Sequence, residues 1–106
     1  MEIPGDDSGG GASASRFMLK LYITGQTAKS QRAIANLRRI AEEELGEAYY
    51  ELVIIDVLEQ PGLAEEEKIL ATPTLIKQLP PPTRRIIGDL ANTEKVLAGL
   101  DLVHNK

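Results

Sequence analysis

The sequence predicts an α/β fold whose elements follow the order strand, helix, strand, helix, strand, strand, helix. First, a helical pattern lies between two apolar, β-prone stretches, and this order predicts a right-handed parallel unit. Second, Thr72-Pro73-Thr74 opens a further apolar run. Third, Pro80-Pro81-Pro82 separates that run from Arg84-Arg85-Ile86-Ile87, which predicts two antiparallel strands joined across the prolines.

The helix of the parallel unit is predicted over Ala28–Leu45. Its apolar residues recur at helical spacing: Ile34, Leu37, Ile40, Ala41 and Leu45. Thr27 or Ser30 is available as N-cap, and Gly46 is the expected stop. The flanking strands are predicted at Met18–Thr24, ended by Gly25, and at Tyr50–Leu58, where Leu52–Ile55 has the continuous apolar character of a strand buried on both faces.

The second half of the chain supports two interpretations. In the first, Pro61–Leu70 is a short helix, Thr74–Leu79 and Arg84–Ile87 are strands, and Asn92 caps a last helix that runs through Leu100. In the second, Pro82 begins a helix that includes Ile86 and Ile87, and residues 100–103 form a strand. Local preference does not choose between the two, and such conflict predicts that this half can adopt two folds.

Composition sets limits on the function. The chain has 106 residues, which predicts one domain, and residues 1–16 are so rich in Gly and Ser that we expect a disordered tail before a domain at 17–104. A net charge of −4 argues against nucleic acid as the main partner. No export signal and no membrane span is indicated, so a cytoplasmic location is expected.

The sequence contains no cysteine. Thiol-disulfide exchange needs an attacking thiolate, so that chemistry is excluded. No other enzyme activity, metal or cofactor is predicted: Thr27 and Ser30 read as helix caps, and Glu65-Glu66-Glu67 reads as a solvated helix face. What remains is a protein that acts by binding.

Four cations are the candidate binding residues: Lys68, Lys77, Arg84 and Arg85. They either protect an exposed strand edge or form a basic patch that meets acidic residues of a protein partner. Near the end of the chain, Gly99 and Asp101 both oppose a final helix, because glycine has low helix propensity and an acidic residue near the C-terminus opposes the macrodipole.

The order strand, helix, strand, helix, strand, strand, helix is that of thioredoxin-like domains, which place a cis-proline beside their active site, here at Pro73. The chain resembles the KaiB family of bacterial circadian clock proteins from Lys20 to Leu102. The resemblance rests on Lys20-Leu21-Tyr22, Ile55-Asp56-Val57, Lys68 through Leu75, Leu79 through Leu90, and Glu94 through Leu102.

This resemblance implies a protein without catalytic activity that changes its fold. A ground-state homotetramer with the order β-α-β-β-α-α-β is expected to rearrange its second half into a thioredoxin-like monomer. Pro73, Gly88, Gly99 and Asp101 are the expected fold-switch positions. The implied partners are the ATPase ring of KaiC, then KaiA and an output histidine kinase. The alternative is a thioredoxin-like sensory domain related to the input domain of that kinase.

Overall fold

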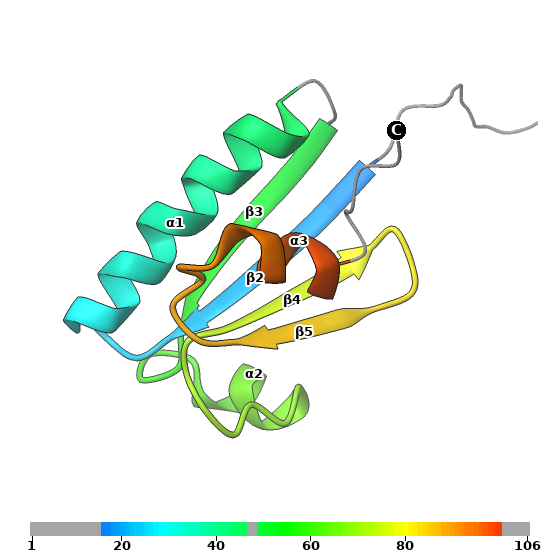
Figure 1. The fold of residues 1–106 in the computed structure, drawn as a ribbon. Helices are drawn as coiled ribbons and strands as arrows, with labels where there is room; N and C mark the ends of the chain where they lie inside the picture. Colours follow the sequence, from blue (N-terminus) through cyan, green and yellow to red (C-terminus); the bar gives the residue numbers. More distant parts are fainter. Residues whose placement is uncertain (1–15, 47–48, 101–106) are drawn as a thin grey trace, which may run out of the picture.

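The computed structural model describes residues 16–46 and 49–100, and in these residues it has the element order that the sequence predicts (Figure 1). Its strands and helices are β2 (Arg16–Ile23), α1 (Ala28–Leu45), β3 (Tyr49–Asp56), α2 (Pro61–Glu66), β4 (Thr74–Leu79), β5 (Arg84–Ile87) and α3 (Thr93–Gly99). The first described strand, β2, begins at Arg16, the last residue assigned to the predicted tail, which pairs with Tyr49 of β3. Residues 1–15, and the end of the predicted domain at 101–104, lie outside the described residues.

The strands form a single mixed sheet in the order β3-β2-β4-β5. β2 pairs with β3 in parallel, from Arg16 opposite Tyr49 to Ile23 opposite Asp56, which confirms the predicted parallel unit. β4 pairs antiparallel with β2 on one side and with β5 on the other. β4 is therefore a central strand, and it joins the two halves of the chain.

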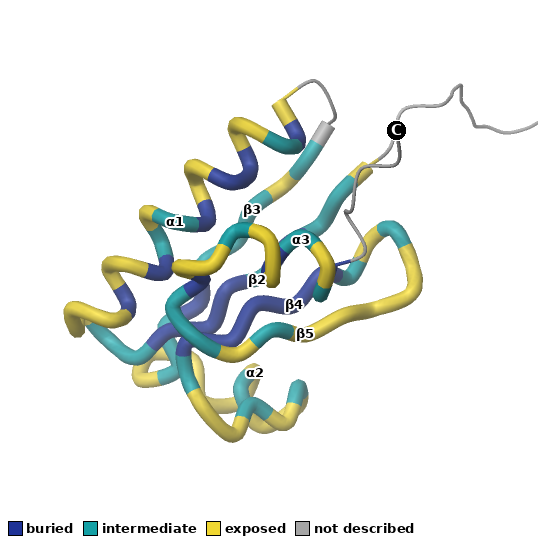
Figure 2. The backbone as a smooth tube through the Cα atoms, viewed as in Figure 1, coloured by how far each residue is buried: buried dark blue, intermediate teal, exposed yellow. Residues whose placement is uncertain are grey.

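The pairing register assigns the side chains to two faces. One face carries Leu19 and Leu21 of β2 and Leu75 of β4, which belong to one core cluster with the buried residues of α1 and with Val96 and Leu100. The other face carries Tyr22, Ile55 and Ile76, against which Ile69, after α2, packs. Helices α1 and α3 thus cover one face, and the segment around α2 covers part of the other (Figures 1 and 2).

Strand β3 is less buried than the sequence predicts. Of Leu52 to Ile55, only Ile55 is buried, at 4% exposed, and the other three are half-buried. β3 lies at an edge of the described sheet, and the segment around α2 packs only near the end of β3 that Ile55 occupies. The expectation of burial on both faces is therefore wrong for most of this strand.

Helix α2 is shorter than predicted. It begins with Pro61, as expected, but ends at Glu66 rather than at Leu70. Lys68 adopts a left-handed backbone conformation with φ of 56°, which the right-handed helix cannot continue through. The chain then turns toward the Thr72-Pro73 peptide bond, which is cis, as the Thr-Pro-Thr pattern predicted.

In this arrangement Arg84–Ile87 is a strand, so the helix that could begin at Pro82 is not formed. Its pairing with β4 satisfies backbone groups, and Ile86, opposite Leu75, packs against the larger core cluster. The second interpretation also predicts a strand at 100–103. Of these residues only Leu100 is described, and it forms the C-cap of α3.

Gly99 has a packing role in addition to its low helix propensity. A Cβ atom at this position would lie 2.8 Å from Cδ1 and 3.0 Å from Cγ1 of Ile86. Such distances are shorter than a normal carbon contact, so the Ile86 side chain would have to move. The absence of a side chain at Gly99 thus lets α3 approach β5 closely.

We therefore predict that Gly99 and Ile86 are energetically coupled. The effect of Gly99→Ala on the free energy of unfolding should be more favourable by about 1 kcal/mol in an Ile86→Val background than in the wild type. The reason is that valine lacks the methyl group that the new Cβ meets. Urea unfolding of the four proteins of the cycle measures this coupling. The control is Gly62→Ala in α2, where no atom beyond the chain neighbours and the adjoining helix backbone lies within 4 Å of the added Cβ. Its effect should be equal in both backgrounds, and additivity at Gly99 would contradict the proposed contact.

Candidate protein-binding site

Two loops meet where the carboxyl ends of the parallel strands β2 and β3 face the Thr72-Pro73 bond. The hydroxyl oxygens of Thr24, which follows β2, and Thr72 are 2.6 Å apart, at hydrogen-bond distance. The Asp56 carboxylate, at the end of β3, accepts from the amides of Gly25 and Leu58, both at 3.0 Å. These bonds hold three segments together at the edge where α/β folds commonly bind ligands.

Thr27 and Ser30 lie at the start of α1, beside this edge. The Thr27 hydroxyl accepts from the Ser30 amide at 3.1 Å, so Thr27 is the N-cap. The buried Ser30 hydroxyl donates to the Thr24 carbonyl at 3.3 Å and accepts from the Thr27 hydroxyl at 2.9 Å. These bonds to neutral groups stabilise the helix start and give the Ser30 oxygen no base for activation, which fits the predicted capping role.

A groove opens between α2 and the segment that follows it. Its cavity of about 510 Å³ is lined by Val57, Pro61, Ala64, Glu65, Lys68, Ile69 and Leu70. A smaller hollow of about 220 Å³ shares several of these residues and continues to Thr24 and Thr72. The groove is mostly apolar and has one carboxylate and one ammonium group at its rim, a composition typical of binding sites.

Two exposed leucines lie in the loops of this region: Leu70 lines the groove, and Leu58 follows Val57, which also lines it. Leu70 is 95% exposed and Leu58 is 68% exposed, although both are large apolar residues. An exposed leucine contributes little to the stability of the isolated domain, whereas it gains free energy when a partner covers it. No sequence signal indicates this role: the patterns predict a strand at Leu58 and a helix at Leu70, whereas both residues lie in loops.

The predicted cations Lys68 and Arg85 lie together beside α2. The Arg85 guanidinium donates to the main-chain oxygens of Glu67 and Lys68, the latter at 3.4 Å, and lies 3.6 Å from the Glu67 carboxylate. Arg85 therefore closes the C-terminal end of α2, where a positive charge complements the helix dipole. Lys68 is exposed at the rim of the groove.

Lys77 does not join that surface. Its side chain is 1% exposed, and its Nζ donates to the carbonyl oxygens of Pro80 and, at 3.0 Å, of Pro82. Arg84 is paired opposite Lys77, so these two residues lie on the face of the sheet that α1 and α3 cover, whereas Arg85 lies opposite Ile76 on the other face. The expectation of one patch of four cations is therefore corrected: Lys77 stabilises the proline connection, and Lys68 and Arg85 remain beside the groove.

The expected fold-switch positions are partly brought together. The Gly88 amide donates to the Pro73 carbonyl at 2.9 Å, and Gly88 has a φ of 129°, a conformation that favours glycine. Gly99 lies further along, against Ile86. Asp101 lies outside the described residues. The Pro73–Gly88 bond thus connects the start of β4 to the end of β5, which is consistent with a role of both residues in this arrangement.

The pKa of Tyr22 is raised by its surroundings near α2. Burial raises the pKa of its phenol above the ordinary value of 10.0, the carboxylates of Glu67 and Glu66 raise it further, and Arg85 opposes them. The side chain is 1% exposed and packs with Ile55 and Ile76. A neutral phenol is therefore favoured at this position of the core.

No group of three or more possible metal-ligating residues is found in the described part of the chain. Among the same residues, no helix is long and apolar enough to cross a membrane. With no cysteine in the sequence, the fold and site define a thioredoxin-like domain that lacks the thiols of the redox enzymes.

The comparisons with known proteins agree with this class and narrow it. The family model described as KaiB domain matches residues 20–102, and the chain belongs to the KaiB family. It is 66% identical over 89 residues to circadian clock protein KaiB3 of Synechocystis, covering 84% of this chain and 86% of that protein. It is 58% identical over 95 residues to circadian clock oscillator protein KaiB of Prochlorococcus marinus, with 90% of each chain covered.

Solved structures of low sequence identity share the fold. The N-terminal domain of Synechococcus elongatus SasA superposes with a TM-score of 0.69 at 21% identity, covering 92% of this chain and 95% of that one. Mitochondrial thioredoxin 3 from Saccharomyces cerevisiae gives a TM-score of 0.65 at 18% identity, covering 82% of this chain and 78% of that one. The predicted thioredoxin-like architecture is thus confirmed, while the alternative order of the second half is not.

The raised pKa of Tyr22 predicts how stability depends on alkaline pH. The folded chain retains the phenolic proton at pH values where the unfolded chain has lost it, so this contribution is complete below about pH 10 and is lost as the pH rises through the folded pKa. We expect the free energy of unfolding to fall less steeply above pH 10 in Tyr22→Phe than in the wild type. Urea unfolding from pH 8 to 11 measures the slopes. Tyr50→Phe is the control for loss of a phenol elsewhere, and equal slopes for Tyr22→Phe and the wild type would contradict the prediction.

Proposed function

We propose that this protein is a circadian clock component that binds the ATPase ring of KaiC and regulates its phosphorylation cycle and output, without catalysis of its own. The observation that carries the proposal is the match of the KaiB domain over residues 20–102, on a thioredoxin-like fold that lacks cysteine. Its site offers an apolar groove, two exposed leucines and the cations Lys68 and Arg85 in place of a nucleophile. These features suit a protein surface.

We further propose that the form described here is the binding form. In the cytoplasm the chain would rest as a homotetramer with the order β-α-β-β-α-α-β and bind KaiC as a thioredoxin-like monomer. The sequence supports this because residues 82–87 are also compatible with a helix and residues 100–103 with a strand. A switch of this kind lowers the apparent affinity for a partner by the fraction of molecules in the binding form.

KaiA and an output histidine kinase are the further proposed partners. The fold that the chain shares with the SasA N-terminal domain, at 21% identity, supports this proposal at the level of the fold. The alternative, a sensory domain of such a kinase, is less well supported, since the KaiB relatives are 58% to 66% identical over most of both chains.

The groove predicts that Leu70→Ser weakens KaiC binding without loss of fold. Because Leu70 is 95% exposed, its replacement should change the free energy of unfolding by less than about 0.5 kcal/mol. Loss of a leucine buried in a complex should weaken binding by about tenfold or more. Titration of each variant with the KaiC ring and ATP, read by size-exclusion chromatography or anisotropy, measures the affinity.

Leu79→Ser is the control, because Leu79 is also exposed but lies at the end of β4, outside the groove. It should bind as the wild type does. If the wild type fails to bind the ring at all, the proposed function is wrong. Normal binding of Leu70→Ser would show that the groove is not the docking surface.

The charge at the groove rim predicts a second effect. Lys68→Glu should slow association with KaiC, and the difference from the wild type should shrink at high ionic strength, since exposed complementary charges mainly control the encounter. Lys68 is better suited to this test than Arg85, whose replacement would also open the end of α2. Lys95→Glu makes the same charge change at an exposed position of α3. The association rates of both variants are measured at two salt concentrations. An equal fall for the two variants would contradict a specific role of Lys68.

A further inference from the structure

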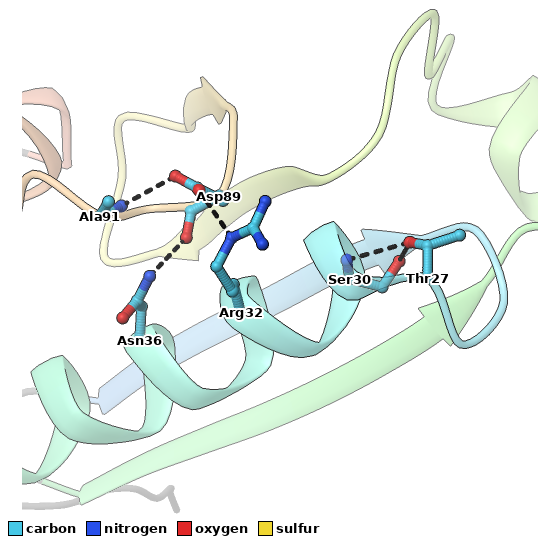
Figure 3. A network of polar contacts seen from close by, with 6 residues as sticks. All are labelled: Thr27, Ser30, Arg32, Asn36, Asp89 and Ala91. Carbon is cyan, nitrogen blue, oxygen red and sulfur yellow. Dashed lines mark hydrogen bonds and ion pairs between the residues drawn. The ribbon is translucent and has the colours of Figure 1, made fainter.

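Polar side chains of α1 fasten the connection between β5 and α3. Asn36 Nδ2 donates to the Asp89 carbonyl oxygen at 2.8 Å, and Arg32 Nε lies 3.3 Å from the Asp89 carboxylate (Figure 3). One turn further along α1, Arg39 Nη2 donates to the Thr93 hydroxyl at 3.2 Å. We call Arg32, Asn36 and Arg39 the α1 clasp.

The clasp residues form a stripe on α1 at the spacing of helix turns. Each of them lies one residue before a buried residue of α1 that packs into the core, namely Ala33, Leu37 and Ile40. The position of the clasp is therefore fixed by the burial of its neighbours. Any segment that bonds to it must lie along the margin of the α1–sheet interface.

The connection that the clasp holds has an uncommon backbone. Gly88 has a φ of 129° and Leu90 a φ of 64°, and a leucine adopts a positive φ only at an energetic cost. Leu90 is nevertheless 3% exposed, within the core. The Asp89 carboxylate also accepts from the Ala91 amide at 3.2 Å, as Figure 3 shows. Bonds from α1 to Asp89 thus stabilise a turn that local preference alone does not favour.

These bonds have a consequence for the choice between two folds. α1 lies in the first half of the chain, for which the sequence predicts one structure, whereas residues 61–103 are compatible with two. Contacts of α1 with Asp89 and Thr93 form when the connection runs along α1, as it does in the thioredoxin-like arrangement. We propose that the α1 clasp selects this arrangement of the second half over the alternative, an inference that rests on the proposed fold switch.

The members of the clasp do not contribute equally. The Arg32–Asp89 pair is open to water, with side chains 59% and 29% exposed, so solvent screens it and its contribution is small. The bond from Asn36 is shorter and partly buried, and its loss would leave the Asp89 carbonyl without this partner. Asn36 is therefore the main positioning residue of the clasp, and Arg32 supports it.

The test is the double variant Arg32→Ala/Asn36→Ala in the full chain. Alanine favours helix at both positions, so α1 itself should persist. We expect the ratio of thioredoxin-like to alternative form to fall by about fivefold to thirtyfold. The ratio is measured from amide signals of residues 61–100 in ¹H–¹⁵N spectra, with saturation transfer where one form is sparse. The apparent affinity for KaiC should fall by the same factor when the binding form is the minor one.

Gln31→Ala/Arg38→Ala is the matched control. It removes one amide and one guanidinium group from exposed positions of the same helix, and in the described residues no side-chain hydrogen bond or ion pair joins either one to residues 88–93. Its ratio should equal that of the wild type. If the α1 clasp only stabilised the domain, the double variant would lower the urea midpoint of both halves together and leave the ratio unchanged. That result would overturn this inference but not the proposed function. A single set of signals in every protein would overturn both the inference and the proposed switch.

Discussion

The second half of the fold depends on the pairing of β4 with β2. Residues Thr74 to Lys77 are buried without a break, because both faces of this strand are covered. The strand carries Leu75 into the cluster beneath α1 and α3, and Ile76 into the cluster beside α2. β5 then pairs with β4, and α3 packs against β5. Loss of the β2–β4 pairing would therefore release β4, β5 and α3 together.

The same pairing creates the candidate site. β4 begins directly after the Thr72-Pro73 bond, so its register with β2 places Thr72 beside Thr24 at the carboxyl ends of the parallel strands. In a redox enzyme of this fold the site would need thiolates. In this KaiB-family chain it instead has threonine and serine hydroxyls that stabilise loops and a helix start, beside an apolar groove. A site without thiols but with exposed leucines is suited to recognition of another protein.

Buried and exposed cations have different consequences in this structure. Lys77 is stable in the interior because carbonyl oxygens of Pro80 and Pro82 accept from its ammonium group, so the charge is compensated where solvent is excluded. Arg85 remains partly exposed and stabilises the end of α2. Arg32 lies in solvent and makes only a weak pair with Asp89, while Asn36, which carries no charge, makes the firmer bond to the same residue. Burial and geometry, more than charge, decide what each of these side chains contributes.

The sequence by itself determined the elements of the first half and limited the second half to two possible orders. The bounds of α1 and β4 follow from apolar periodicity and prolines, and short polar side chains indicate the caps: Asn92 for α3, and Thr27 or Ser30 for α1, of which the structure has Thr27. Only the tertiary structure decided between the two interpretations of the second half, because pairing of β5 with β4 and contacts with α1 join residues far apart in the chain. It also decided which cations are exposed: Lys77 lies in the central strand β4 and bonds to the carbonyl oxygens of Pro80 and Pro82, whereas Arg84 and Arg85 are exposed on the edge strand β5. The groove likewise depends on how the segment after α2 folds back, which no local pattern specifies.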